Sequence, residues 1–322
     1  LGFYSSISII FPVFSTILII FYGSQEVNLG FLTIGALVGI NVLNSRIYAP
    51  ITRFSVYNTF SKNDNSASFL KKNKSVIKYE NYEGVMPKIF KGDIILKNLA
   101  LGFNSNKTIL FQRLNCTLPS GSVTVISGYN SSGKTSLCNS LIGLIEPIKG
   151  NILFNNIDIK NYNIKYLRRN ISYVPQEIDL FNMSIKDNIK INLDSSSSNY
   201  NNDGFLIKVI KMVGLESFIN NLTDGLDTQV QDNGKNIPRG IKKRIALARA
   251  IISDGKIVIL DEPTSALDLD GLNKLYKILN DFRALKKTII IASHDQNIIK
   301  SAGIIIDLSV KPIPRIGVRK KN

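Results

Sequence analysis

The chain has 322 residues, enough for more than one structural unit, and its 40 Lys and Arg against 24 Asp and Glu give a formal net charge of +16. Such an excess is compatible with a nucleic-acid surface or an anionic membrane surface. Much of it lies in solvated runs at residues 71–74 and 319–321, which equally fit a composition bias. The two cysteines, Cys116 and Cys138, have the spacing of neither a metal site nor a disulfide framework, so composition excludes both and predicts reduced packing residues.

Apolar side chains dominate the N-terminal part of the chain. Residues 1–22 carry no charge and, at 1.5 Å per residue, are long enough to cross a hydrocarbon core of about 30 Å. A second uncharged run, residues 27–45, follows a short polar hairpin at residues 23–26. The basic residues after it place the end of the second run in the cytoplasm by the positive-inside rule; they are Arg46, Arg53, Lys62, Lys71 and Lys72. Residues 1–57 are therefore predicted to be the C-terminal part of a transmembrane domain with two helices.

Two alternatives bear on this prediction. A cleaved signal peptide fits poorly, because the first run lacks a basic start and a small-residue cleavage site and is followed by another apolar run. A buried helical hairpin of a soluble protein stays open, because Pro12, Asn41 and Asn44 lower the hydropathy. The chain begins with Leu1 rather than Met, so we expect further segments, including more helices, upstream.

Residues 58–93 are polar without a sustained apolar period and predict a linker that is partly helical. From residue 94 to residue 310, short β-branched runs alternate with helical patterns, which predicts an α/β domain with a largely parallel sheet. The runs are residues 94–96, 123–127, 171–174, 257–260 and 288–292. The composition of residues 194–199 predicts a solvated loop, and that of residues 311–322 predicts a basic tail.

A phosphate-binding loop follows the run at 123–127. Residues 128–135 match the P-loop (Walker A) pattern G-x-x-x-x-G-K-[ST] at every fixed position, and residues 136–142 predict a helix directly after it. Backbone N–H groups at that helix start favour an anion, so a chance glycine-rich turn is the weaker alternative. We expect Lys134 to reach the β- and γ-phosphates of a nucleoside triphosphate and Thr135 to ligate Mg²⁺. The predicted nucleotide contacts are Gly128, Tyr129, Asn130, Ser131, Ser132, Gly133, Lys134, Thr135 and Ser136.

Two adjacent carboxylates, Asp261 and Glu262, end the apolar run at 257–260. Because consecutive strand side chains point in different directions, one carboxylate can hold magnesium while the other faces an attacking water. In P-loop enzymes the first anchors the metal, so we expect that role for Asp261 and a general-base role for Glu262. His294, the sole histidine of the sequence, follows the run at 288–292, at the sheet edge where ligands bind in such folds.

Together these motifs resemble the ATP-binding domain of an ABC transporter over residues 94–310. The resemblance implies that Gln176 contacts magnesium and water and couples to the membrane domain, and that Phe103 stacks on adenine. It further implies that His294 contacts the γ-phosphate. The implied catalytic residues are Glu262, His294 and Gln176; the implied magnesium ligands are Thr135, Gln176 and Asp261; the implied D-loop is Ser265, Ala266, Leu267 and Asp268.

The apolar part resembles the last helices of bacterial type I secretion exporters, at residues 32–38 and 44–50, and residues 167–171 and 179–181 agree with this. The resemblance implies a multi-pass protein of the bacterial plasma (inner) membrane with its ATP-binding domain in the cytoplasm, exporting a protein or peptide. The implied unit is a homodimer, or a heterodimer, that sandwiches two ATPs and works with a periplasmic adaptor and an outer-membrane channel. A soluble P-loop ATPase acting on nucleic acid is the alternative class; the uncharged runs disfavour it, so no nucleic-acid partner is expected.

One segment departs from the family pattern. The signature Leu-Ser-Gly-Gly-Gln, which contacts the partner subunit's ATP, falls on Ile237, Pro238, Arg239, Gly240 and Ile241, where only the glycine at 240 matches. Proline lacks the hydroxyl and the N–H of serine, and arginine is bulky, although its guanidinium can serve a phosphate. One lost hydrogen bond to a charged group costs about 1.5–3 kcal/mol, or roughly ten- to a hundredfold in rate. This leaves two interpretations: an active exporter ATPase, and a regulatory subunit that binds ATP with little turnover.

Overall fold

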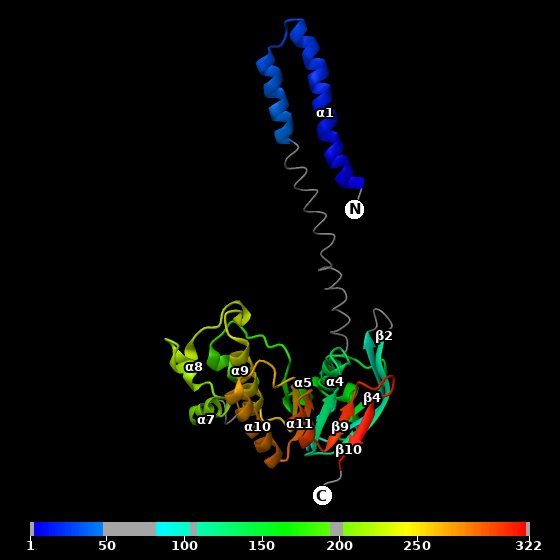
Figure 1. Cartoon of the computed structure of the whole chain (residues 1–322), viewed down its shortest axis with the longest axis vertical. Helices are drawn as coiled ribbons and strands as arrows, with labels where there is room; N and C mark the ends of the chain where they lie inside the picture. Colours follow the sequence, from blue (N-terminus) through cyan, green and yellow to red (C-terminus); the bar gives the residue numbers. More distant parts are fainter. Residues whose placement is uncertain (1–2, 48–81, 104–107, 194–201, 320–322) are drawn as a thin grey trace. The chain divides into compact units, whose positions relative to one another are not determined.

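The computed structural model describes residues 3–47, 82–103, 108–193 and 202–319. The chain divides into two compact units, Leu1–Tyr79 and Glu80–Asn322 (Figure 1). The predicted loop at 194–199 and residues 58–81 of the predicted linker lie outside the described residues.

The first unit is a helical hairpin. Helix α1 spans Phe3–Asn28, and residues 34–47 form a second helix. The helices meet where their residues are small or polar: a Cβ at Gly23 would lie 2.2 Å from Leu37 Cδ1, and Asn44 Nδ2 donates to Ser15 Oγ at 2.9 Å. Asn44, whose polarity lowers the hydropathy of the sequence, thus pairs across the hairpin.

The turn of the hairpin lies later in the chain than the uncharged runs at residues 1–22 and 27–45 predict. Helix α1 continues through residues 23–26, and the turn falls after Asn28, where Gly30 adopts a φ of 78° and Leu32 N–H donates to Glu26 O. The polar residues at 23–26 therefore form the last turns of α1. Within the described ranges no helix combines the length and the apolar character needed to cross a membrane.

The second unit contains two sheets. The antiparallel sheet has the order β2-β1-β4-β5. The larger sheet has the order β10-β9-β3-β8-β7-β6, in which the strands from β9 to β6 pair in parallel and β10 is antiparallel. The bounds are β1 Ile94–Phe103, β2 Thr108–Leu118, β3 Val123–Ser127, β4 Lys149–Phe154, β5 Ile157–Asp158, β6 Ile171–Val174, β7 Ile257–Asp261, β8 Thr288–Ala292, β9 Ile304–Asp307 and β10 Arg315–Val318. This confirms the predicted α/β class.

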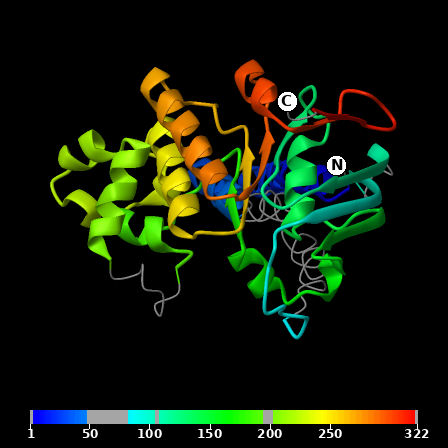
Figure 2. The ribbon, with the colours of Figure 1, turned by 90° about the horizontal axis from the view of Figure 1, so that it is seen from below.

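Strands β7 and β8 are buried along their whole length, because helices cover both faces of the sheet. Helix α4 packs between the two sheets, whereas α6, α7, α9 and α10 form a second core on the other face (Figure 2). The helix bounds are α4 Lys134–Leu141, α5 Ile164–Arg169, α6 Ile185–Lys190, α7 Asp203–Val213, α8 Glu216–Asn220, α9 Arg239–Ile252, α10 Leu269–Ala284 and α11 Gln296–Ser301, with short 3₁₀ turns at Ile159–Asn161, Gly225–Asp227 and Asp232–Gly234.

The unit extends beyond residues 94–310 at both ends. At the N-terminal end Thr288 Oγ1 donates to Gly92 O at 2.7 Å, and Val85 forms a β-bridge with Tyr162. At the C-terminal end β10 lies within the segment predicted as a basic tail and pairs with β9. Both additions depend on pairing with residues far away in the sequence, which composition does not reveal.

Candidate functional site

The site is built at the carboxyl end of the larger sheet, starting with the loop between β3 and α4. Gly128 has a φ of 149° and Gly133 a φ of 109°, and a Cβ at Gly128 would lie 2.5 Å from Ser132 Oγ. Only glycine tolerates this combination of backbone angle and crowding. The Ser132 hydroxyl is buried without a hydrogen-bond partner, and no side chain caps α4. Unused donors thus converge on the loop, as an anion such as phosphate requires.

Lys134 holds this loop in shape. Its ammonium donates to Gly128 O at 2.9 Å and to Tyr129 O at 3.3 Å, and it lies 3.4 Å from Glu262 Oε1. The side chains of Lys134 and Glu262 are each 8% exposed, so the pair is largely shielded from water. The loop and the end of β7 therefore share one buried cation.

Asp261 presents a buried carboxylate at the end of β7. Both of its oxygens are buried and accept no well-formed hydrogen bond. Burial raises the pKa of Asp261, the nearby Thr135 hydroxyl opposes this, and the charge of Glu262 adds to it. An unpaired buried carboxylate is costly, and a divalent cation is a suitable counter-charge. Asp261 and Thr135 therefore fit a Mg²⁺ ion, which proteins hold with few ligands of their own and with phosphate oxygens. The described residues contain no cluster of three or more His, Cys, Asp or Glu suited to a metal.

A tight turn directs Glu262 back toward the loop. Its φ is 45°, in the left-handed region, its N–H donates to Ala292 O at 2.9 Å, and its carbonyl accepts from Ser265 Oγ at 2.7 Å. A non-glycine residue in this region is uncommon and carries backbone strain, and strained residues are enriched at functional sites. Glu262 Oε2 lies 3.0 Å from Nδ1 of His294, whose side chain is 75% exposed. The fold thus brings Lys134, Glu262 and His294 together, as an ATP-hydrolysing site would need.

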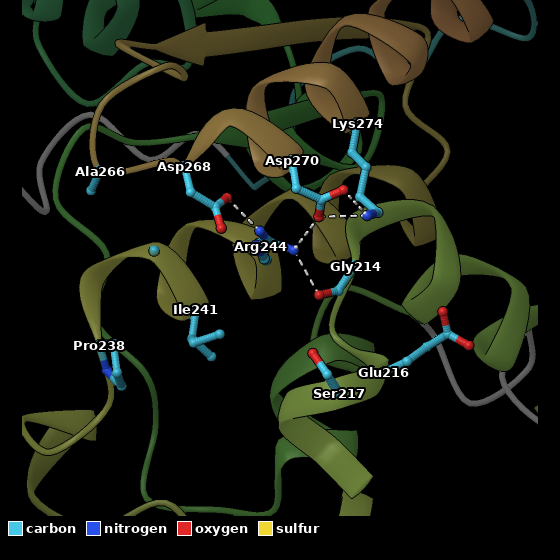
Figure 3. A pocket seen from close by; sticks show the side chains of 11 residues that line it. Gly214, Glu216, Ser217, Pro238, Ile241, Arg244, Ala266, Asp268, Asp270 and Lys274 are labelled. Atoms are coloured by element: carbon cyan, nitrogen blue, oxygen red, sulfur yellow. Dashed lines mark hydrogen bonds and ion pairs between the residues drawn. The ribbon is translucent and has the colours of Figure 1, made fainter. Parts of the chain in front are cut away.

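The predicted signature and D-loop segments also lie side by side. A Cβ at Gly240 would lie 2.8 Å from Ala266 O, so the start of α9 packs closely on this turn. From helix α9, Arg244 donates to Asp268 Oδ1 at 2.6 Å and to Gly214 O at 2.7 Å (Figure 3). The Gly271 N–H and then Arg244 lower the pKa of Asp268. A pocket of about 510 Å³ opens between these elements.

Two predicted site residues are not joined to this cluster by a described side-chain contact. Gln176 is exposed in the segment after β6. Phe103 is the last residue of β1, and its side chain lies outside the described residues. Their roles therefore stay predictions. Tyr129, Asn130 and Ser131 are exposed at the tip of the loop.

Two lysines near the site are absent from the sequence-based prediction. Lys243 is 2% exposed and donates to Pro175 O at 3.2 Å and Gln176 O at 3.4 Å. Its spacing from Leu247 and Ala250 places it on the apolar face of a helix. A lysine on such a face is the sequence pattern that could have predicted its burial. Lys311 donates to Ser132 O at 2.8 Å from the predicted tail, a contact that no local pattern reveals.

Comparisons with known proteins identify relatives of this chain. Residues 111–265 match the family model described as ABC transporter. The chain is 33% identical over 303 residues to the mitochondrial iron-sulfur clusters transporter ATM1 of Saccharomyces cerevisiae, covering 92% of this chain and 43% of the relative. It is 31% identical over 302 residues to the alpha-hemolysin translocation ATP-binding protein HlyB of Escherichia coli O157:H7, covering 93% and 42%. The chain thus spans less than half the length of these relatives.

A solved structure supports the fold. The structure of a bacterial Atm1-family ABC exporter with ATP bound superposes with a TM-score of 0.67 at 23% identity, covering 89% of this chain and 50% of the other.

Proposed function

We propose that this chain, which carries an ABC transporter ATPase domain related to those of ABC exporters, is the ATP-binding and ATP-hydrolysing subunit of a membrane exporter for a protein or peptide. The meeting of Lys134, Glu262 and His294 beside the buried carboxylate of Asp261 carries the proposal. It provides a phosphate cradle, a candidate base and a magnesium ligand within one site.

The chemistry is hydrolysis of the bond between the β- and γ-phosphates. A water oxygen attacks the γ-phosphorus in line, the bond to the ADP oxygen breaks, and a Glu262 carboxylate oxygen accepts the proton of the water. Lys134 balances charge on the phosphates, and His294 orients the γ-phosphate and Glu262. Mg²⁺, when bound through Asp261, Thr135 and Gln176, supplies charge neutralisation at the phosphate oxygens.

The export role rests on the relatives and on the first unit. HlyB is described as a translocation ATP-binding protein. This chain is also 32% identical over 293 residues to the toxin RTX-III translocation ATP-binding protein of Actinobacillus pleuropneumoniae. In the first unit, large apolar side chains are exposed, Phe31 at 80% and Ile34 at 71% among them. An apolar surface of this kind is normally covered by lipid or another chain. The proposal therefore includes type I secretion at the bacterial inner membrane, with an adaptor and an outer-membrane channel as partners.

In this proposal the working unit is a homodimer or heterodimer, in which residues 237–241 of one subunit close over the ATP of the other. One observation favours a weakly hydrolysing, regulatory subunit as the second candidate. Helix α9 begins at Arg239, and Pro238 at its N-cap supplies no side-chain hydrogen bond. The segment therefore lacks one donor that a serine would offer.

Nucleotide binding and hydrolysis by purified protein test the ATPase part. We expect Glu262→Gln to keep MgATP affinity and to lose turnover by about 10²-fold or more, and Lys134→Met to weaken binding by at least about tenfold. The exposed Glu177→Gln serves as the matched control and should change neither. Absence of MgATP binding by the unmodified protein, or full turnover by Glu262→Gln, would overturn this part. Release of the protein from membranes by carbonate alone would overturn the exporter part.

A further inference from the structure

A buried lysine links helix α9 to the segment that carries Gln176. Lys243 is among the largest fully buried side chains, at 2% exposure, and it lies one turn after Arg239. Its ammonium donates to the carbonyls of Pro175 and Gln176, at 3.2 and 3.4 Å, directly after β6 ends. Helix α9 also packs against β6. These two hydrogen bonds therefore tie the backbone at Gln176 to the helix that starts at the predicted signature segment.

The position of Lys243 is costly and needs a physical reason. Burial lowers the pKa of Lys243 to about 8, while the charges of Asp261 and Glu262 partly oppose this shift. A methionine of similar length would fill the same space without the desolvation cost. The ammonium instead satisfies two carbonyls and adds a second positive charge near the carboxylates, on the helix side, where Lys134 supplies the first from the loop side.

From this geometry we infer that Lys243 is a positioning residue: it holds the backbone of Pro175 and Gln176 against α9 and so sets where Gln176 stands relative to the magnesium ligand Asp261. The inference rests on the proposed function, because it assigns Gln176 to the metal site. It also gives a physical route by which movement of the predicted signature segment, at the start of α9, reaches Gln176.

Lys287 is a matched control. It is also a buried lysine, 5% exposed, and donates to Asp254 Oδ1 at 2.6 Å and Gly255 O at 2.9 Å. It precedes β8 and lies at the opposite end of β7 and β8 from Asp261, because Ile257 pairs with Thr288 and Asp261 pairs with Ala292. Removing its charge therefore perturbs a buried lysine without touching Gln176.

The test compares Lys243→Met, Lys243→Gln and Lys287→Met in the full chain. ATP affinity is measured with Mg²⁺ and with EDTA, and amide hydrogen exchange of residues 175–178 is followed without nucleotide. Mg²⁺ should increase the ATP affinity of Lys243→Met about tenfold less than it increases that of the unmodified protein, the size typical of residues that orient metal ligands. The ATP affinity in EDTA should be unchanged. Amide hydrogen exchange at residues 175–178 should be faster. Lys243→Gln, which keeps an N–H donor, should recover part of both effects.

Each outcome decides a different point. Wild-type values for Lys243→Met in both measurements overturn the inference, as do equal losses for Lys287→Met. If Lys243→Met does not fold, the comparison of Lys243→Gln with the unmodified protein decides in the same way. If the unmodified protein binds no ATP, the proposed function fails, while exchange at 175–178 still decides whether Lys243 holds this segment.

Discussion

Replacing Pro238 separates two consequences of the altered signature segment. Pro238 occupies the N-cap of α9 with a φ of −54° and a ψ of 142°, and its carbonyl accepts from Lys242 N–H at 3.0 Å, but its side chain caps nothing. A serine there can accept a hydrogen bond from an N–H of the first turn. A serine at an N-cap stabilises the helix by about 1 kcal/mol more than an alanine does. Pro238→Ser and Pro238→Ala both lose the rigidity of proline, which is worth about 0.4–1 kcal/mol. The difference between their free energies of unfolding therefore measures the N-cap hydrogen bond alone.

We therefore expect Pro238→Ser to unfold about 2–4 °C above Pro238→Ala, the shift that about 1 kcal/mol produces in a domain of 150–250 residues. Thermal unfolding without nucleotide measures this. If the serine also reaches the partner's phosphates, Pro238→Ser combined with Arg239→Gly should hydrolyse ATP roughly ten- to a hundredfold faster than the unmodified protein. Equal unfolding temperatures for the serine and alanine variants would refute the N-cap argument. Equal ATPase rates would refute the effect of the signature segment on turnover.

Three further predictions follow from the same geometry. Gly128→Ala should weaken ATP binding by about tenfold or more, because φ is 149° and the new Cβ would meet Ser132 Oγ at 2.5 Å; Gly303→Ala, with its nearest contact at 3.6 Å, should bind normally in the same titration. Arg244→Met should lower the free energy of unfolding in urea by about 1–3 kcal/mol, because the carbonyl of Gly214 loses its donor, and Arg244→Lys should recover only part of this loss. Burial lowers the pKa of Lys243 from 10.5 to about 8, so below pH 8 the folded state bears the full cost of the buried charge. Between pH 8 and 10.5 the folded protein releases this proton before the unfolded chain does, and its free energy of unfolding relative to Lys243→Met should rise, by at most about 3 kcal/mol. A flat difference across that range in urea titrations would contradict the assigned shift.

Local patterns predicted much of the fold. The bounds of β3, β6 and β8 coincide with the β-branched runs at 123–127, 171–174 and 288–292, because strands buried on both faces need continuous apolar residues. The predicted helix after the phosphate loop is α4, which begins two residues earlier, at Lys134. The turn of the N-terminal hairpin was misplaced, because residues 23–26 are polar but remain helical, and the turn depends on Gly30.

The sequence by itself determined the phosphate loop, the carboxylate pair and the α/β class, because each depends on neighbours in the chain or on the periodicity of apolar residues. Only the tertiary structure decided that Lys134, Glu262 and His294 meet, that Glu262 turns back through a left-handed backbone, and that Gly240 packs on Ala266. It alone showed that Lys243 reaches the carbonyl of Gln176 and Lys311 that of Ser132. These contacts join residues far apart in the sequence, and a buried ammonium finds its partners only when the packing of the sheet and helices excludes water around it.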